Sequence, residues 1–336
     1  MQTLIVTGGA GFIGSNFARY ILKKYPTYKV HVLDSLTYAG NLDNLADLQS
    51  NPNFEFTKGD IRDAQVVNEL SAKADTIINF AAESHVDRSI VNPGEFIQTD
   101  VAGVYTLLEA ARTHKHDRFL HISTDEVYGT IPEGSFKEGD PLEPNSPYSA
   151  SKAGGELLVR AFNVTYGLNT LVTRGSNTFG PYQYPEKLIP LFVTNLIDGE
   201  KVPVYGDGQQ VRDWLYVLDH AAGVDIALHH GTPGQVYNVG GGNERTNLEI
   251  TSRILNLMGK DESSIRHVQD RPGHDRRYSI DCSKLKALGF QQTLNFEERL
   301  KETVEWYQQN EAWWRAIKEK QVEYQEFMKN WYADRK

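Results

Sequence analysis

The chain has 336 residues, enough for one large domain or two smaller ones, and its composition of 40% apolar and 24% charged residues is ordinary for a globular protein. Its formal net charge of −9 argues against a general nucleic-acid-binding protein, which would carry a basic face. No apolar run approaches the roughly 20 residues of a membrane helix. A strand-like run begins almost at once and leaves no room for a signal peptide, and the single cysteine, Cys282, allows no internal disulfide. We therefore expect a cytoplasmic protein.

Short apolar runs rich in β-branched residues alternate with longer helical patterns through the first half of the chain. The predicted strands span residues 3–7, 29–34, 54–58, 76–80, 119–123 and 169–173. Helical patterns lie between them, among others over residues 12–24, 64–72 and 101–114. This alternation predicts βαβ units in a doubly wound parallel sheet of the Rossmann type, a member of the α/β class. The strands lack strict polar alternation, as expected for parallel strands that are covered on both faces.

The composition of the sequence changes after about residue 174. Residues 175–190 are rich in Gly, Pro and Tyr and predict an extended, irregular segment, after which short strands, turns and helices indicate a smaller lobe. We predict a Rossmann domain over 1–175, with a segment of about 212–232 returning to it, and a smaller α/β lobe with C-terminal helices over 176–336. The tail from residue 311 mixes aromatic and charged residues at helical spacing, which predicts a helix packed on the body or on a partner.

The first predicted strand runs into the glycine-rich sequence TGGAGFIGSN. Gly9, Gly11 and Gly14 satisfy the GxGxxG pattern, and Gly8 with the last two satisfies GxxGxxG. Such glycines let the backbone approach a pyrophosphate, and the N-terminus of the following helix supplies N–H groups and a partial positive charge. Asp34 ends the second strand, where a carboxylate would bind a ribose 2′-hydroxyl and repel a 2′-phosphate. The pattern predicts an NAD site rather than an NADP site, the alternative being a glycine-rich turn without a ligand.

Tyr148 and Lys152 lie at the start of a predicted helix and are four residues apart, which places both on one helical face. An ammonium group near a phenol stabilises the phenolate and would lower the Tyr148 pKa from its ordinary value of about 10. The tyrosine could then take a proton from an alcohol while a hydride leaves for a nicotinamide. Ser123 and Thr124 add hydroxyl groups at the end of a strand.

Two carboxylates, Asp125 and Glu126, stand side by side directly after that strand. Such a pair more often caps a turn or faces solvent. Beside a nicotinamide site, however, like charges in a partly buried setting raise one pKa and can keep one carboxyl protonated near neutral pH. The pair therefore indicates one acid and one base for a reaction that needs both.

These motifs together resemble the extended short-chain dehydrogenase/reductase family and, within it, the dTDP-glucose 4,6-dehydratases. The similar segments are AAESHVDRSI, STDEVYG, SPYSASKA, GPYQYPEKLIP, YGDGQQVRDW and DRPGHDRRY, within residues 8–278. The resemblance implies oxidation of a hexose at C4, elimination of water across C5 and C6, and return of the hydride to C6, with NAD recycled. It implies that Asp125 protonates the leaving C6 hydroxyl, that Glu126 accepts the C5 proton and that Thr124 hydrogen-bonds the C4 oxygen.

The same resemblance and the strand ends together give the expected ligand contacts. The residues expected to contact NAD are Gly8, Gly11, Phe12, Ile13, Gly14, Asp34, Thr37, Asp60, Ile61, Ala81, Ala82, Thr99, Tyr148 and Lys152. The residues expected to contact the nucleotide sugar are Ser84, His85, Thr124, Asn177, Lys187, Leu188, Pro203, Tyr205, Arg212, Asn247, Arg271, His274 and Tyr278. The arginines supply the cations that a diphosphate needs in an acidic protein, because guanidinium forks pair well with phosphate oxygens.

Other features set the limits of this interpretation. The adjacent His229 and His230 would diverge on a helix, and no cysteine or carboxylate cluster completes a site, so we expect no metal and place both histidines at the surface. The resemblance implies a homodimer, formed through helices near 101–114 and 150–166. The alternatives are a nucleotide-sugar 4-epimerase, a 4,6-dehydratase of another nucleotide hexose, and a non-catalytic NAD-binding sensor. Neither the nucleobase nor the later pathway, to rhamnose or another deoxysugar, leaves a motif.

Overall fold

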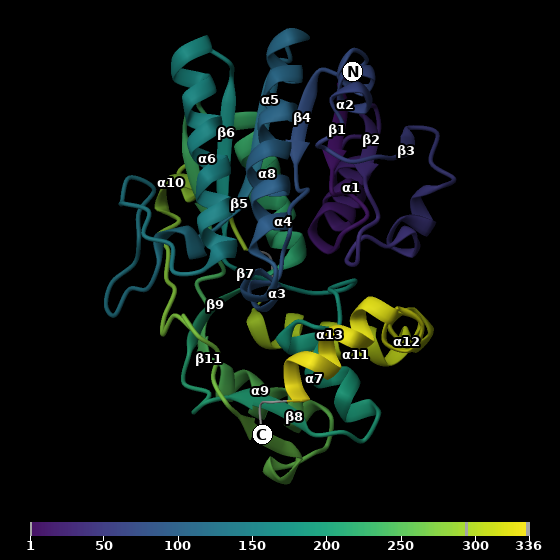
Figure 1. The fold of residues 1–336 in the computed structure, drawn as a ribbon, viewed down its shortest axis with the longest axis vertical. Coiled ribbons are helices and arrows are strands. Elements are labelled where there is room, and N and C mark those ends of the chain that lie inside the picture. Colours follow the sequence, from purple (N-terminus) through teal and green to yellow (C-terminus); the bar gives the residue numbers. More distant parts are fainter. Residues whose placement is uncertain (1, 293–294, 334–336) are drawn as a thin grey trace.

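The computed structural model describes residues 2–292 and 295–333, and Figure 1 shows a larger lobe above a smaller one. The larger lobe is built on a seven-stranded parallel sheet in the order β10-β6-β5-β4-β1-β2-β3. Its strands are β1 (Thr3–Thr7), β2 (Lys29–Asp34), β3 (Phe54–Lys58), β4 (Thr76–Asn79), β5 (Arg118–Thr124), β6 (Thr170–Gly175) and β10 (Val236–Val239). Because β1 lies between β2 and β4, the chain winds outward in both directions, and the predicted doubly wound Rossmann sheet is confirmed.

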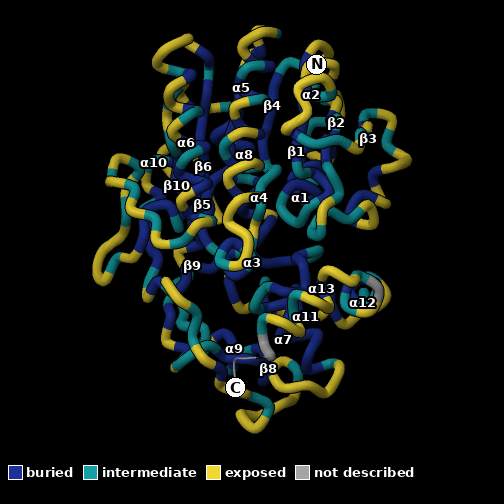
Figure 2. Tube along the Cα trace, in the orientation of Figure 1, coloured by how far each residue is buried: buried dark blue, intermediate teal, exposed yellow. Residues whose placement is uncertain are grey.

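Helices cover both faces of this sheet. They are α1 (Phe12–Lys24), α2 (Ala64–Ser71), α5 (Val104–Thr113), α6 (Pro147–Tyr166) and α8 (Val217–His230), while the short helices α3 (Val86–Val91) and α4 (Pro93–Ile97) pack against α6. Side chains of β1 alternate between two cores: Leu4 and Val6 pack in the core that contains α1 and α8, and Ile5 packs in the core that contains α2, α5 and α6. Figure 2 shows the central strands buried and the outward faces of these helices exposed.

The smaller lobe has a three-stranded sheet, β11-β9-β7, and a two-stranded sheet, β12-β8. Its strands are β7 (Asn177–Phe179), β8 (Val202–Tyr205), β9 (Val211–Tyr216), β11 (Glu244–Thr246) and β12 (Ile265–Val268). Its helices are α7 (Leu188–Ile197), α9 (Asn247–Leu257), α11 (Phe296–Gln309), α12 (Glu311–Lys320) and α13 (Val322–Ala333). The core between these elements is rich in aromatic residues, among them Phe179, Trp214 and Trp314.

The chain crosses between the lobes more than once. Strand β9 belongs to the small sheet, after which α8 and β10 return to the large sheet, where β10 pairs in parallel with β6. A second return brings the short helix α10 (Ser283–Lys286) against β10, with Leu285 and Phe290 buried in the core of the larger lobe. The parallel pairing of β10 requires a crossover such as α8, because parallel neighbours cannot be joined by a tight turn.

Two local expectations differ from the structure. The helix predicted over 101–114 is divided into a π-helical turn, Gln98–Gly103, and α5. The expectation that both adjacent histidines lie at the surface is wrong for His229, whose ring stacks on Tyr25 with centroids 4.8 Å apart and whose Nδ1 lies 2.8 Å from the Asp225 carboxylate. A histidine one helical turn after a buried acid on α8 completes a contact between α8 and α1, and periodicity alone does not display that partner.

None of the helices within residues 2–292 and 295–333 is both long and apolar enough to cross a membrane. Within the same ranges, no three His, Cys, Asp or Glu side chains gather as metal ligands would. The outermost residues of the predicted lobes, Met1 and 334–336, lie outside the described residues.

A buried ion pair fastens α6 to the end of β6. Arg174 contacts the Glu156 carboxylate with Nη2 at 2.7 Å, and both side chains are at most 5% exposed. The Arg174 guanidinium carbon also lies 4.5 Å from the centre of the Tyr128 ring. Glu156 follows Tyr148 and Lys152 at intervals of four residues, so one face of α6 carries all three side chains toward β5 and β6.

We predict that Arg174→Met lowers the free energy of unfolding by about 3 to 5 kcal/mol, because it leaves the Glu156 carboxylate buried and uncompensated. The matched control is Arg276→Met, which breaks the exposed pair with Asp207 and should leave the free energy of unfolding nearly unchanged. Urea denaturation of both variants measures the difference, and equal losses would contradict a structural role for the buried pair.

Candidate active site

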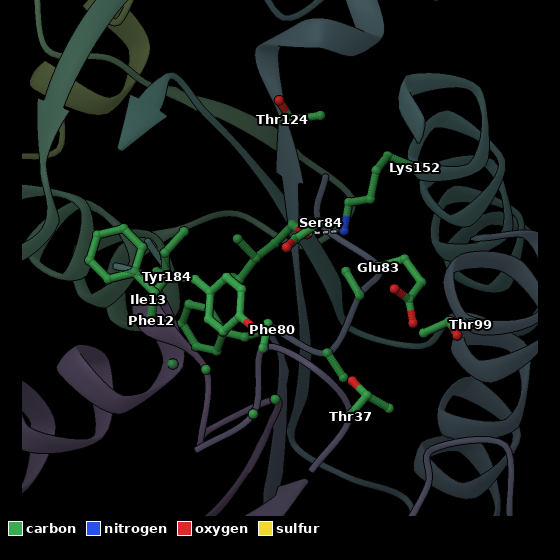
Figure 3. Close-up of a pocket in the computed structure, with 18 of the residues that line it drawn as sticks. Phe12, Ile13, Thr37, Phe80, Glu83, Ser84, Thr99, Thr124, Lys152 and Tyr184 are labelled. Carbon is green, nitrogen blue, oxygen red and sulfur yellow. Dashed lines mark hydrogen bonds between the residues drawn. The ribbon is translucent and has the colours of Figure 1, made fainter. Parts of the chain in front are cut away.

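A cavity lies where the carboxyl ends of the large sheet's strands meet the smaller lobe. Every residue predicted to contact NAD lines it. Asp125 and Glu126 also line it, together with four residues predicted to contact the sugar nucleotide: Ser84, Thr124, Asn177 and Lys187. Figure 3 shows Lys152 projecting from its helix into this region and Glu83 facing Thr99. Residues from both lobes therefore enclose one site at the position where doubly wound sheets bind ligands.

The glycine-rich loop between β1 and α1 has two kinds of glycine. Gly8 has φ of +66° and a Cβ there would lie 2.5 Å from the Ala81 backbone nitrogen; a Cβ on Gly14 would lie 2.4 Å from the Gly8 carbonyl oxygen. These two positions need glycine for close packing. Gly11, by contrast, lines the cavity, and a Cβ there would meet only the Gly8 carbonyl oxygen, at 3.2 Å. The open side of Gly11 leaves room for a pyrophosphate at the N-terminus of α1.

Asp34, at the end of β2, holds this loop in shape. Its Oδ2 accepts a hydrogen bond from the Ala10 N–H at 2.9 Å, and its Oδ1 accepts one from the Leu36 N–H at 2.8 Å. Burial raises the pKa of Asp34, and the two backbone hydrogen bonds oppose that rise. Each carboxylate oxygen keeps a further lone pair for a hydroxyl, so the loop and this acid fit the ribose and pyrophosphate of NAD.

The local structure at the end of β5 allows both adjacent carboxyls, Asp125 and Glu126, to line the cavity. Thr124 caps a short 3₁₀ turn, Asp125–Tyr128, by accepting the Glu126 N–H on its hydroxyl oxygen at 3.2 Å. The threonine thus performs the capping, and neither carboxyl is needed for it. Asp125 is 2% exposed, and its Oδ2 has no hydrogen-bond partner among the described residues.

The two carboxyls have different electrostatic surroundings. Burial raises the pKa of Asp125 well above its ordinary value, and the nearby Glu126 and Asp213 raise it further. Burial also raises the pKa of Glu126, but Arg271, Arg212 and Lys187 oppose that rise. The surroundings therefore favour the protonated form of Asp125 more strongly, while cations near Glu126 favour its carboxylate.

The expectation that Lys152 lowers the Tyr148 pKa is wrong for the structure as it stands. The Lys152 ammonium donates to the Ile122 carbonyl oxygen at 2.8 Å. Burial raises the pKa of Tyr148 well above its ordinary value, and the carboxylates of Glu126 and Asp100 raise it further. Negative charges around the phenol oppose the phenolate, and its burial withholds the water that would stabilise it.

A chain of polar contacts joins the sugar-nucleotide residues beside the cavity. Arg271 donates to Asp87 Oδ1 at 2.8 Å, and the Tyr205 hydroxyl donates to Asp87 Oδ2 at 2.9 Å. Arg212 is buried, donates to the Asp275 carbonyl oxygen at 2.9 Å, and lies 4.2 Å from the centre of the Tyr278 ring. These interactions fix two guanidinium groups near Glu126.

The other residues that were predicted to contact the sugar nucleotide lie outside the cavity lining. Burial, together with Arg271 and Arg212, lowers the pKa of His274 to about 4, and its Nδ1 lies 2.5 Å from Asp270 Oδ1. Nine predicted residues are not part of the cavity lining, namely His85, Leu188, Pro203, Tyr205, Arg212, Asn247, Arg271, His274 and Tyr278. Leu188 packs against the smaller lobe's core, and Asn247 begins α9 with its N–H on the Gln210 carbonyl oxygen.

Several residues of the site were not predicted from the sequence. Asp100, in the π-helical turn, accepts the Ser151 hydroxyl at 2.6 Å and the Glu83 N–H at 3.1 Å. Burial raises the pKa of Asp100 to about 6, and burial with the nearby Asp100 raises that of Glu83 to about 7. For Asp100 the available signal was an acid inside a helical pattern. For Glu83 it was a position in the loop after β4, and for Asp87 a position in the first turn of α3.

Comparison with known proteins places this geometry in a family. The model of a family described as GDP-mannose 4,6 dehydratase matches residues 5–303. A dTDP-glucose 4,6-dehydratase of Streptomyces niveus is 51% identical over 320 residues, which cover 94% of this chain and 95% of that protein.

Two solved structures show how far the fold extends. DesIV, a dTDP-glucose 4,6-dehydratase of Streptomyces venezuelae with NAD and TYD bound, has a TM-score of 0.93 at 51% identity and covers 94% of this chain and 99% of that one. A UDP-glucose 4-epimerase of Thermotoga maritima with UDP-glucose has a TM-score of 0.85 at 30% identity, covering 91% and 99%. The chain belongs to the GDP-mannose 4,6 dehydratase family.

Proposed function

We propose that the protein is a dTDP-glucose 4,6-dehydratase, a hydro-lyase that uses NAD and forms dTDP-4-keto-6-deoxyglucose. The observation that carries the proposal is the Asp125–Glu126 pair, in which the buried Asp125 has an Oδ2 without a hydrogen-bond partner among the described residues and Glu126 lies near cations. Removal of water across C5 and C6 needs an acid and a base at once, and this pair supplies both.

In the proposed mechanism, the side chains of the site transfer protons to and from the sugar and hydrogen-bond its C4 oxygen. The glycine-rich loop and Asp34 would hold NAD, which would supply a hydride acceptor for C4 and a hydride donor for C6, without net oxidation. Tyr148 would take the proton of the C4 hydroxyl once the positive charges of the nicotinamide and of Lys152 favour its phenolate, and Thr124 would hydrogen-bond the C4 oxygen. The resulting ketone acidifies C5–H, whose proton passes to Glu126. The C5–C6 double bond forms as the C6–O bond breaks, and Asp125 gives its proton to the departing hydroxyl, which leaves as water. When C6 regains the hydride, Glu126 returns its proton to C5, and the proton held by Tyr148 balances the one that Asp125 lost.

Three cationic side chains are available for the diphosphate of the substrate, although the protein as a whole is acidic. Arg212 and Arg271 are fixed by contacts on the smaller lobe's side, and Lys187 donates to the Ser84 carbonyl oxygen at 2.6 Å. Arginine forks suit phosphate oxygens, because two parallel N–H groups can bind them. The other two arginines of the same segment have different partners: Arg276 pairs with Asp207 and Arg277 with Glu244.

A 4-epimerase is the competing activity, because the fold is shared with epimerases. Epimerisation needs reversible oxidation at C4 only, so it gives the two adjacent carboxyls no task. The identity of 51% to dTDP-glucose 4,6-dehydratases, against 30% to the epimerase, also favours dehydration.

We also propose a homodimer formed by α5 and α6. Their outer faces expose large apolar side chains: Tyr105 is 51% exposed, Leu157 59% and Val164 67%. Apolar residues on adjacent helices favour association with a second copy, since a symmetric pair buries the same surface twice. The lone Cys282 needs no oxidising environment, which favours action in the cytoplasm.

The first test is turnover. We expect incubation with dTDP-glucose and catalytic NAD to yield a product lighter by one water, without accumulation of NADH, and UDP-glucose to react more slowly. Mass spectrometry of each sugar nucleotide measures this. Inversion at C4 with unchanged mass would instead support the epimerase, and no change with either sugar despite bound NAD would favour another nucleotide hexose or the sensor.

We predict that Asp125→Asn and Glu126→Gln each lower kcat for water loss by about 10²- to 10⁴-fold, because each removes a proton-transfer group. The nicotinamide should still be reduced in a single turnover, since oxidation at C4 does not need these carboxyls. Near-ultraviolet absorbance and product mass separate the two steps. The matched control is Glu133→Gln, an exposed acid whose loss should leave kcat unchanged; wild-type kcat in both site variants would refute the assigned roles.

We predict that the double variant Leu157→Glu, Val164→Glu is a monomer. Dimer formation would bury the introduced carboxylates of both copies in the contact, which is unfavourable in free energy. Sedimentation equilibrium of the variant beside the wild type measures the mass. Leu257→Glu, a similarly exposed leucine on α9, serves as the control and should leave the mass unchanged. A wild-type protein that sediments as a monomer would rule out the proposed dimer.

A further inference from the structure

We propose that the C-terminal helix α13 is part of the nucleotide-sugar site, with Trp331 as a positioning residue for Tyr205, Asp87 and Arg271. This inference rests on the proposed function, which assigns Arg271 to the substrate's diphosphate or nucleoside. The family model's match ends at residue 303, so α12 and α13 lie beyond the region that the family description covers.

The first contact is a hydrogen-bond relay through Trp331. Its indole N–H donates to the Tyr205 hydroxyl oxygen at 2.7 Å, and that hydroxyl donates to Asp87 Oδ2 at 2.9 Å. Asp87 Oδ1 accepts from Arg271 at 2.8 Å. The relay joins α13, β8, α3 and the loop that carries Arg271. Since a hydroxyl that accepts one hydrogen bond becomes a better donor of another, the indole strengthens the hold of Tyr205 on Asp87.

A second set of contacts seats α13 on the cavity wall. The Phe327 ring lies 4.3 Å from the Arg88 guanidinium carbon and packs edge-on to the His85 ring at 5.6 Å. Tyr324 is buried and packs edge-on to Tyr184, a residue that lines the cavity. Figure 1 shows the C-terminal helices, in yellow, as the part of the smaller lobe that lies beneath the larger lobe.

The relay ends on a guanidinium with capacity left for a ligand. Arg271 is largely buried, and its Nε has no hydrogen-bond partner among the described residues. A buried, unpaired guanidinium N–H is costly unless a ligand satisfies it, and a phosphate oxygen is the acceptor that a guanidinium fork fits best. Asp87 fixes the plane of this fork, and Trp331 fixes Asp87 through Tyr205. α13 thus controls substrate affinity without touching the reacting atoms.

The test compares Trp331→Phe, which removes the N–H and keeps an aromatic ring, with Tyr205→Phe and with the double variant. Calorimetric titration of the NAD-loaded proteins with dTDP measures affinity, and steady-state assays give KM and kcat. We expect Trp331→Phe to weaken dTDP binding and raise KM by about two- to tenfold, the effect of one lost hydrogen bond, with kcat and NAD affinity unchanged. Lys329→Ala, at an exposed position of α13, is the matched control.

The double variant tells positioning from packing. If Trp331 acts through the Tyr205 hydroxyl, then Trp331→Phe adds nothing in the Tyr205→Phe background. Wild-type dTDP affinity in a Trp331→Phe protein whose thermal unfolding matches that of the control overturns the inference. Additive losses in the double variant overturn it as well. A wild-type protein that fails to bind dTDP or to dehydrate dTDP-glucose refutes the proposed function itself, which is a distinct result.

Discussion

Two adjacent carboxyl groups held in a buried site are the constraint on which the rest of the site depends. Water stabilises a carboxylate strongly, so burial of Asp125 and Glu126 is unfavourable unless one is neutral and the other is compensated. The structure meets both conditions. The turn after β5 is capped by Thr124, which frees the carboxyls from a structural task. The burial that is unfavourable for the two carboxyls also shifts their pKa values, and shifted pKa values suit groups that transfer protons.

Compensation comes from the other side of the cavity. The cations that oppose the rise of the Glu126 pKa are Arg271, Arg212 and Lys187, all beyond β6 in the sequence. The larger lobe therefore supplies the acids and the cofactor loop, and the later part of the chain supplies the positive charge. Neither part contains a complete electrostatic site, which explains why the cavity lies where the two lobes meet.

Features that depend on neighbouring residues were predictable from the sequence, and features that depend on distant ones were not. The glycine loop and Asp34 follow from a strand, a turn and a helix in immediate succession. By contrast, the upward shift of the Tyr148 pKa comes first from burial and then from Glu126 and Asp100, all of which act on it only through the fold. The Arg271–Asp87 pair joins residues 184 positions apart, and no periodicity reveals such a partner. The roles given to individual residues of the cavity stay predictions.

The seventh strand has a consequence for how the protein is made. β10 completes the edge of the large sheet only after the chain has built β7, β8 and β9 of the smaller lobe, and Leu285 and Phe290 reach the same core later still. A fragment that stops near residue 175 would leave β6 as an uncovered edge and α1 without α8. The larger lobe thus cannot be completed on the ribosome until the chain has emerged beyond Phe290.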